Sequence, residues 1–194
     1  MKLHSKHLVI FFILTLLMLF TRFNHFGSSV SFPDASLAVF LLGGFFLSRF
    51  SRLSLAAFAF FLLEAGAIDY FAIAHYGVDD YCFSPAYWLL IPTYASMWFA
   101  GHWFAARQQN NLTDIAWFAG ISWLSTSVAF LISNGAFYSL SGKFTEMNIA
   151  EYAIRVAKYY PSYVSGTLIY LALAAIIYVA LNSLQKSYTG AARQ

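Results

Sequence analysis

Cys82 is the only cysteine of this chain and the side chain best suited to metal ligation or nucleophilic chemistry. It lies in a short segment, residues 79–87, that contains almost no aliphatic side chains. Ser84 and Pro85 predict that a helix begins just after it, because serine can accept a bond from a free helix amide and proline suits the first helical turn. A helix N-terminus favours a thiolate, whereas the two aspartates at the start of the segment oppose it. We interpret Cys82 as a candidate ligand or nucleophile at the mouth of a pocket.

The composition indicates an integral membrane protein. Of the 194 residues, 60% are hydrophobic and only 10% are charged, which is too apolar for a soluble domain of this length. Lys2 and Lys6 precede an apolar run that no small-residue cleavage motif follows, so we expect an uncleaved first span. The net charge of +3 is scattered along the chain, which argues against nucleic-acid binding.

Six apolar segments predict an all-α fold with six transmembrane helices in a single domain, residues 1–194. A helix needs ~20 apolar residues to cross the hydrocarbon, and somewhat fewer where its ends snorkel. We expect the spans at residues 7–21, 34–48, 53–74, 86–106, 114–138 and 162–184. Helical spacing of apolar residues at 146–160 predicts a further amphipathic helix on the outer surface.

The distribution of Lys and Arg predicts the orientation. With the N-terminus inside, seven of these residues fall on the cytoplasmic side and four on the outer side, which are Arg22, Lys143, Arg155 and Lys158. Because cytoplasmic loops carry the excess of positive charge, both termini are expected in the cytoplasm. Cys82 then faces outward.

Prolines are expected to organise the outer face. Pro33, Pro85 and Pro161 each end an outer connection and open the following span, so three helix N-termini would present free amides there. The simpler interpretation is that proline suits a first helical turn whatever the function. Pro92 is expected to kink the fourth span and widen a cavity below Tyr87.

Acidic residues inside a span are informative, because burying them in lipid is costly and they usually line a cavity. Glu64 and Asp69 both lie in the third predicted span. Asp69 falls near its outer end, on the same side as Cys82, and is the better candidate for a site residue. Small polar residues in the fifth span share one helical face, which is typical of close helix packing.

Several enzyme classes lack their motifs here. No phosphate-binding Gly-x-x-x-x-Gly-Lys-Ser/Thr loop is present, and the five histidines lack the spacing of a zinc site. A thiol enzyme would need a base near Cys82, for which His25 and His75 are the candidates.

Taken together, the layout and three groups of residues resemble the solitary cobalamin transporters of the BtuM family. The residues are Ser31–Asp34 at the start of span two, Asp69 in span three, and Asp80–Tyr87 before span four. These transporters are similar to the substrate-binding S-components of energy-coupling factor transporters. In that family a cysteine coordinates the cobalt of the corrinoid, and Cys82 is the residue that matches it.

The resemblance implies an S-component-like bundle that takes up cobalamin or a related corrinoid from the periplasmic side of a bacterial inner membrane. The Cys82 thiolate would ligate cobalt, and it could displace cyanide from cyanocobalamin as a side activity. Asp69, Tyr87 and His25 would line the pocket. Two aromatic residues beside the cysteine, Tyr81 and Phe83, would offer flat contact to the corrin ring or belong to an interfacial belt.

Other interpretations remain open at this stage. The first span has no small-x-x-x-small docking pattern, so no dedicated ATPase module and no nucleotide are expected, which leaves the driving force unexplained. One alternative is a membrane thiol enzyme, such as an exosortase-like transpeptidase, with Cys82 as nucleophile. Another is a transporter for a different vitamin, with the cysteine incidental.

Overall fold

The computed structural model describes residues 5–24, 32–47, 51–76, 84–109, 111–144, 146 and 148–191. In these ranges the chain is helical and contains no strand, which confirms the all-α prediction. The elements are α1 (Ser5–Asn24), α2 (Ser36–Leu47), α3 (Ser51–Tyr76), the 3-10 helix η2 (Pro85–Leu89), α4 (Leu90–Ala105), α5 (Leu112–Leu140) and α6 (Ile149–Ala191).

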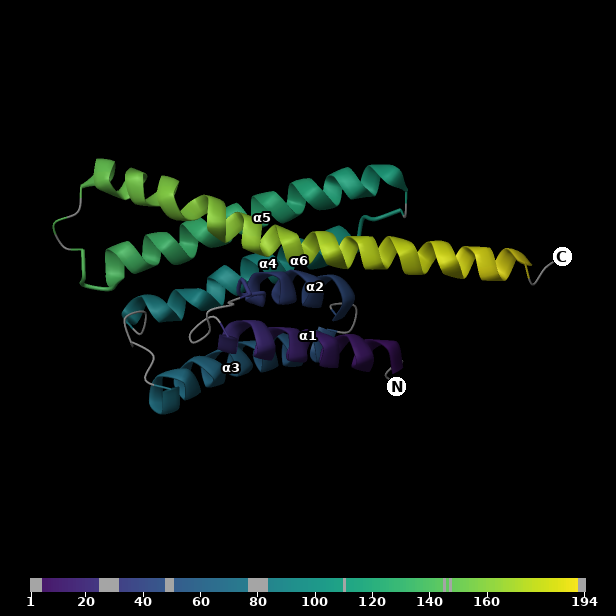
Figure 1. The fold of residues 1–194 in the computed structure, drawn as a ribbon, viewed down its shortest axis with the longest axis horizontal. Coiled ribbons are helices and arrows are strands. Elements are labelled where there is room, and N and C mark those ends of the chain that lie inside the picture. Colours follow the sequence, from purple (N-terminus) through teal and green to yellow (C-terminus); the bar gives the residue numbers. More distant parts are fainter. Residues whose placement is uncertain are drawn as a thin grey trace.

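The helices pack as a layered bundle. Figure 1 shows α2 and α4 between α1 and α3 on one side and α5 and α6 on the other, in agreement with the contacts between elements. The start of α1 and the end of α6 lie at the same end of the bundle.

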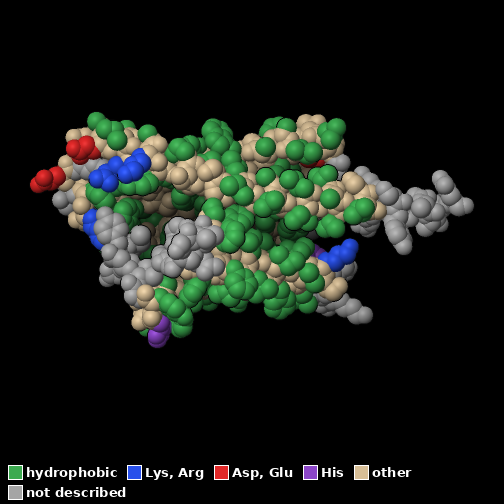
Figure 2. Space-filling model, in the orientation of Figure 1, with side chains coloured by type: hydrophobic (Ala, Val, Ile, Leu, Met, Phe, Trp, Pro, Cys, Tyr) green, Lys and Arg blue, Asp and Glu red, His purple; other side chains and the backbone are tan. Residues whose placement is uncertain are grey.

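Four helices are long and apolar enough to cross a membrane: Ser5–Phe23, Leu53–Tyr76, Leu112–Leu140 and Ile149–Leu184. Their outward side chains are apolar, as Leu63 of α3 (74% exposed) and Ile176 of α6 (66%) illustrate. On the face shown in Figure 2, hydrophobic side chains cover the middle of the bundle and charged ones lie toward its ends. This distribution suits a hydrocarbon environment, so the chain is a membrane protein.

α2 is a short core helix. It has 12 residues, and all but two of them are buried. Twelve residues extend about 18 Å, whereas the hydrocarbon core of a bilayer is about 30 Å thick. The segment predicted as a span at residues 34–48 therefore forms a helix that does not cover the membrane by itself.

The closest helix contact joins α2 to α4. A Cβ atom on Gly44 would lie 2.0 Å from the carbonyl oxygen of Trp98, and one on Gly101 would lie 1.9 Å from the carbonyl oxygen of Leu41. Only glycine lets the two backbones approach this far, as in other membrane helix pairs. This crossing holds α2 at the centre of the bundle.

The predicted span at residues 86–106 consists of two elements. Pro85 opens η2, and the α-helix begins only at Leu90. Pro92 therefore lies in the first turn of α4, where its missing amide hydrogen breaks no α-helical bond. The kink expected at Pro92 inside a continuous helix is wrong, and the irregularity lies at the junction between η2 and α4.

Pro161 does not open a helix. The expected outer helix at 146–160 and the expected span at 162–184 form one 43-residue helix, α6, with Pro161 inside it. A proline inside a helix removes one backbone hydrogen bond and usually kinks the helix. Here Tyr160 is 2.7 Å from the Ser127 hydroxyl and Tyr163 is 3.3 Å from the Ser133 hydroxyl, so α5 holds both flanks. Figure 1 shows the two parts of α6 running in different directions.

Candidate functional site

A buried arginine lies at the centre of a polar cluster formed by α1, α2, α3 and α4. Arg22 belongs to the last turns of α1 and is only 7% exposed. The prediction that it lies in an outer connection is wrong, because α1 continues to Asn24. Burial of the guanidinium is possible because carboxylates from two other segments neutralise it.

Asp69 is the principal partner of Arg22. The arginine Nε donates to Oδ1 of Asp69 at 2.7 Å, and Nη2 donates to Oδ2 at 2.5 Å. Two parallel bonds of this kind are the strongest geometry for an arginine and a carboxylate. Asp69 is itself only 6% exposed, so the pair joins α1 to α3 inside the protein.

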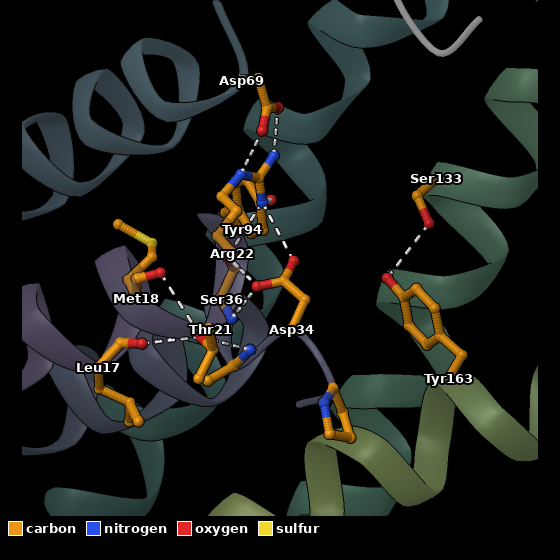
Figure 3. A network of polar contacts seen from close by, with 12 residues as sticks. Leu17, Met18, Thr21, Arg22, Asp34, Ser36, Asp69, Tyr94, Ser133 and Tyr163 are labelled. Carbon is orange, nitrogen blue, oxygen red and sulfur yellow. Dashed lines mark hydrogen bonds and ion pairs between the residues drawn. The ribbon is translucent and has the colours of Figure 1, made fainter. Parts of the chain in front are cut away.

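The remaining guanidinium nitrogen binds the start of α2. Nη1 of Arg22 donates to Asp34 Oδ2 at 3.2 Å, to Ser36 Oγ at 3.0 Å and to the Tyr94 hydroxyl at 2.9 Å. Asp34 also accepts from the backbone amide of Ser36 at 2.9 Å, which satisfies one of the free amides at the start of α2. Figure 3 shows Arg22 between the two aspartates.

Tyr87 connects this cluster to the segment after the cysteine. Its hydroxyl donates to Asp69 Oδ2 at 2.8 Å, which ties η2 to α3. Its backbone amide donates to the Ser84 carbonyl at 2.8 Å. The structure thus brings together two of the predicted site residues, Asp69 and Tyr87. The expected capping role of the Ser84 side chain is wrong, because its hydroxyl makes no cap bond.

Four predicted site residues lie outside the described residues: Cys82, Tyr81, Phe83 and His25. Their predicted roles stay predictions. In sequence, Cys82 lies two residues before Ser84, the next residue that the structure describes, and five residues before Tyr87. The hydrogen bond of the Tyr87 hydroxyl to Asp69 therefore restrains the chain five residues after the cysteine.

The other candidates near this end differ in position. His75 is exposed on the last turn of α3, with its ring 4.5 Å from that of Phe71. Tyr94 is 4% exposed and stacks on Phe40 at 4.2 Å between ring centroids. It belongs to the core and to the Arg22 cluster.

Sequence reasoning missed the partnership of Arg22 with the two aspartates. A signal was present, because Arg22 directly follows an apolar run without an intervening helix breaker and another predicted span carries a buried acid. An acid and a base inside a membrane bundle are expected to pair. Because Arg22 was assigned to an outer loop, it was not considered as a partner for Asp69.

A cavity of about 1020 Å³ opens at the other end of the bundle. Its apolar wall comes from the end of α2, the end of α4, the start of α5 and the C-terminal half of α6, including Phe45, Phe104, Phe118 and Tyr178. The Arg22 cluster lies at the start of α2. A molecule in this cavity would therefore not contact Asp69 or Tyr87.

No model of a known protein family matches this chain, and neither does any curated protein. The function is therefore inferred from the residues and the geometry described above.

Proposed function

We propose that this protein takes up cobalamin or a related corrinoid across the bacterial inner membrane. In this proposal it is a six-pass bundle with both termini in the cytoplasm. The four membrane-length helices supply four passes. The η2–α4 pair extends about 34 Å, long enough for a fifth, and α2 with its flanking residues provides the sixth.

Burial of Arg22 supports the proposed orientation. The positive-inside count set seven cytoplasmic Lys and Arg residues against four outer ones, and Arg22 was one of the four. Because its charge is compensated inside the protein, it no longer counts as a free loop cation. Seven then stand against three, and the bias toward cytoplasmic termini increases.

The observation that carries the proposal is the Tyr87–Asp69 hydrogen bond, taken with the position of Cys82 in sequence. The bond fixes η2 onto α3, and η2 begins three residues after the cysteine. A segment restrained at one end loses less conformational freedom when its thiolate binds a metal. A thiolate is a strong, polarisable donor and suits the axial position of cobalt in a corrin ring.

The neighbouring residues receive distinct roles in this proposal. The Asp69 carboxylate is already bonded to Arg22 and Tyr87, so it acts by holding Tyr87 and with it the start of η2 in place. Tyr81 and Phe83 flank the cysteine and supply aromatic faces to the corrin ring. His25 directly follows α1 in sequence, and the resemblance assigns it to the lining of the pocket.

The proposed ligation also accounts for a side reaction. The Cys82 sulfur donates an electron pair to cobalt and forms a sulfur–cobalt bond. The cobalt–carbon bond of cyanocobalamin breaks, and cyanide leaves with its electron pair and takes a proton from water. No oxidant or reductant is needed, because the step is a ligand exchange.

Purification from cells grown with cobalamin tests the proposal. The wild type is expected to carry a red ligand whose absorption spectrum differs from that of free cobalamin. Cys82→Ser is expected to remove that spectral difference, whereas the matched control Ser133→Ala, on α5, is expected to retain it. An identical spectrum in the wild type and in Cys82→Ser would rule out cobalt ligation.

The same purification separates the competing functions. A colourless preparation whose Cys82 becomes acylated or joined to a peptide would indicate the thiol enzyme. A colourless small-molecule ligand that is retained by Cys82→Ser would indicate a transporter for another vitamin.

A further inference from the structure

Glu64 is an acidic residue that the proposed corrinoid site does not use. It is the fourteenth of the 26 residues of α3 and therefore lies at mid-length of a membrane-crossing helix. One of its carboxyl oxygens is buried and has no hydrogen-bond partner. Asp69, five residues later on the same helix, is in contrast fully bonded to Arg22 and Tyr87.

Glu64 follows Phe60 and Phe61 by about one helical turn, and both rings contact Phe11 of α1, so this half-buried residue lies near the seam between α1 and α3. These helices run in parallel, because Phe11 contacts Phe60 at 4.9 Å between ring centroids and the Arg22–Asp69 ion pair joins them further along. Between these two contacts, Thr15 of α1 comes to the level of Glu64. The Thr15 hydroxyl is also buried without a partner. Two polar groups from facing helices thus lie at one depth with no hydrogen bond to satisfy them.

The charged groups around this seam leave Glu64 without a cation. On α1, Lys6 and His7 lie at least eight residues before Thr15, about 12 Å along the helix, and Arg22 is engaged by the two aspartates. α2 contains no titratable residue.

Four more titratable residues lie on α4 and α3. On α4, the Tyr94 hydroxyl accepts from Arg22 and His102 is exposed. On α3 itself, Tyr70 and His75 are exposed toward its end. Among the described side chains, no ion pair includes Glu64.

An ionised carboxylate at the centre of a membrane helix is costly, and binding a proton removes the charge. We propose that Glu64 is a membrane-embedded proton-binding site, and that exchange of its proton drives inward movement of the corrinoid. The second part rests on the uptake function proposed above. It supplies the driving force for a transporter without an ATPase module.

The Arg22 cluster offers a route by which the proton acts on the corrinoid site. When the Glu64 carboxylic acid releases its proton to inner water, the resulting carboxylate attracts Arg22, the buried cation of the neighbouring helix. It then competes with Asp69, which lies about 7.5 Å further along α3. Since Asp69 also holds Tyr87, losing Arg22 would loosen the attachment to α3 of η2, which follows Cys82 by three residues in sequence. A proton taken up from outer water restores the resting arrangement.

Infrared spectroscopy of the ligand-free protein in lipid tests the proton site. The wild type is expected to show the carbonyl stretch of a protonated carboxyl group at neutral pH, and Glu64→Gln is expected to lose it. The control Glu146→Gln changes an exposed carboxyl between α5 and α6 and is expected to keep it. A band that survives in Glu64→Gln, or is absent from the wild type, would overturn the proton site whether or not a corrinoid binds.

Cobalamin accumulation in reconstituted vesicles tests the coupling. With the membrane potential clamped at zero, one proton per cobalamin permits about tenfold accumulation for each pH unit of outside acidity. The wild type and Glu146→Gln are expected to approach that ratio, and Glu64→Gln is expected to fall to a ratio of about one. Equal accumulation by the wild type and Glu64→Gln, or none by the wild type, would overturn the coupling.

The two proposals fail in different ways. The absorption spectrum of the bound ligand depends on Cys82 and shows separately whether the corrinoid site is intact. A wild type that binds no corrinoid refutes the proposed function, and with it the coupling, while the infrared result still decides the proton site.

Discussion

At the scale of single residues, Arg22 shows how a cation is tolerated inside an apolar bundle. Its guanidinium makes five hydrogen-bond contacts with four side chains. Three of the acceptors share the two N–H groups of Nη1. Three of these bonds reach carboxylate oxygens, so desolvation of the charge is offset by close opposite charges. The opposite charges of the cluster compensate one another, so removing one member leaves the charges of the others buried without a partner.

Replacing Arg22 is therefore expected to be severe. Arg22→Met leaves Asp69 buried without a counter-charge, and we expect a loss of about 3–5 kcal/mol in the free energy of unfolding. Unfolding in detergent, followed by circular dichroism, measures this loss. The control Arg107→Met removes an exposed arginine that lies 4.1 Å over the Trp103 ring, which is expected to cost less than about 1 kcal/mol.

A double substitution separates charge from shape. Arg22→Met combined with Asp69→Leu replaces the ion pair with apolar side chains, and we expect it to recover much of the stability that Arg22→Met loses. If the double variant is no more stable than Arg22→Met alone, the uncompensated Asp69 charge is not the cause of the loss.

At the scale of elements, the contact between α2 and α4 determines where the shortest helix lies. α2 is apolar around its whole circumference, with nearly every residue buried, so no outward polar stripe orients it. Glycines set the distance instead, since Gly44 and Gly101 each face a backbone carbonyl of the other helix. Backbone atoms cannot rotate away as a flexible side chain can.

Alanine at these glycines is expected to separate the two helices. Gly44→Ala places a methyl group against the Trp98 carbonyl, and overpacking of this kind costs about 1–3 kcal/mol in the free energy of unfolding. Gly120→Ala is the matched control, because a Cβ at Gly120 meets no atom within 4 Å. It is expected to be neutral or to gain up to about 1 kcal/mol from helix propensity. Destabilisation of the same size in both variants would contradict a close crossing.

At the scale of the whole molecule, the helices alternate in direction and return the chain to the end where it began. An even number of passes follows if α2 and the η2–α4 pair each complete a crossing. The two ends of the bundle then differ in chemistry. The Arg22 cluster and η2 belong to one end, and the cavity of about 1020 Å³ opens at the other.

Labelling of intact cells tests this orientation. A membrane-impermeant maleimide is expected to react with Cys82 in the wild type without permeabilisation. In a Cys82→Ser background, Gln109→Cys introduces a thiol between α4 and α5, at the other end of the bundle. That thiol is expected to react only after the membrane is opened. The reverse pattern would place the termini outside and remove the proposed site from the periplasmic face.

The sequence alone determined the class of protein and the existence of the helices. The composition shows that the chain is too apolar to fold in water, and the length of each apolar run is a local property of the sequence. Both can therefore be read without knowing how the helices pack. Asp69 was identified in the same way, because a carboxylate inside an apolar run is unusual wherever it packs. The helix ends were less predictable, since tertiary contacts decide whether a proline such as Pro161 ends a helix or lies inside one.

Only the tertiary structure decided which charges meet. Arg22 reaches Asp69 across 47 positions and Tyr94 across 72, and no local pattern encodes such a distance. The same holds for the burial of α2, which depends on the backbone approach of α4. Glu64 combines both kinds of information. Its residue type and its depth in the membrane can be read from the sequence, whereas its lack of a cationic partner follows from the position of Arg22 in the fold.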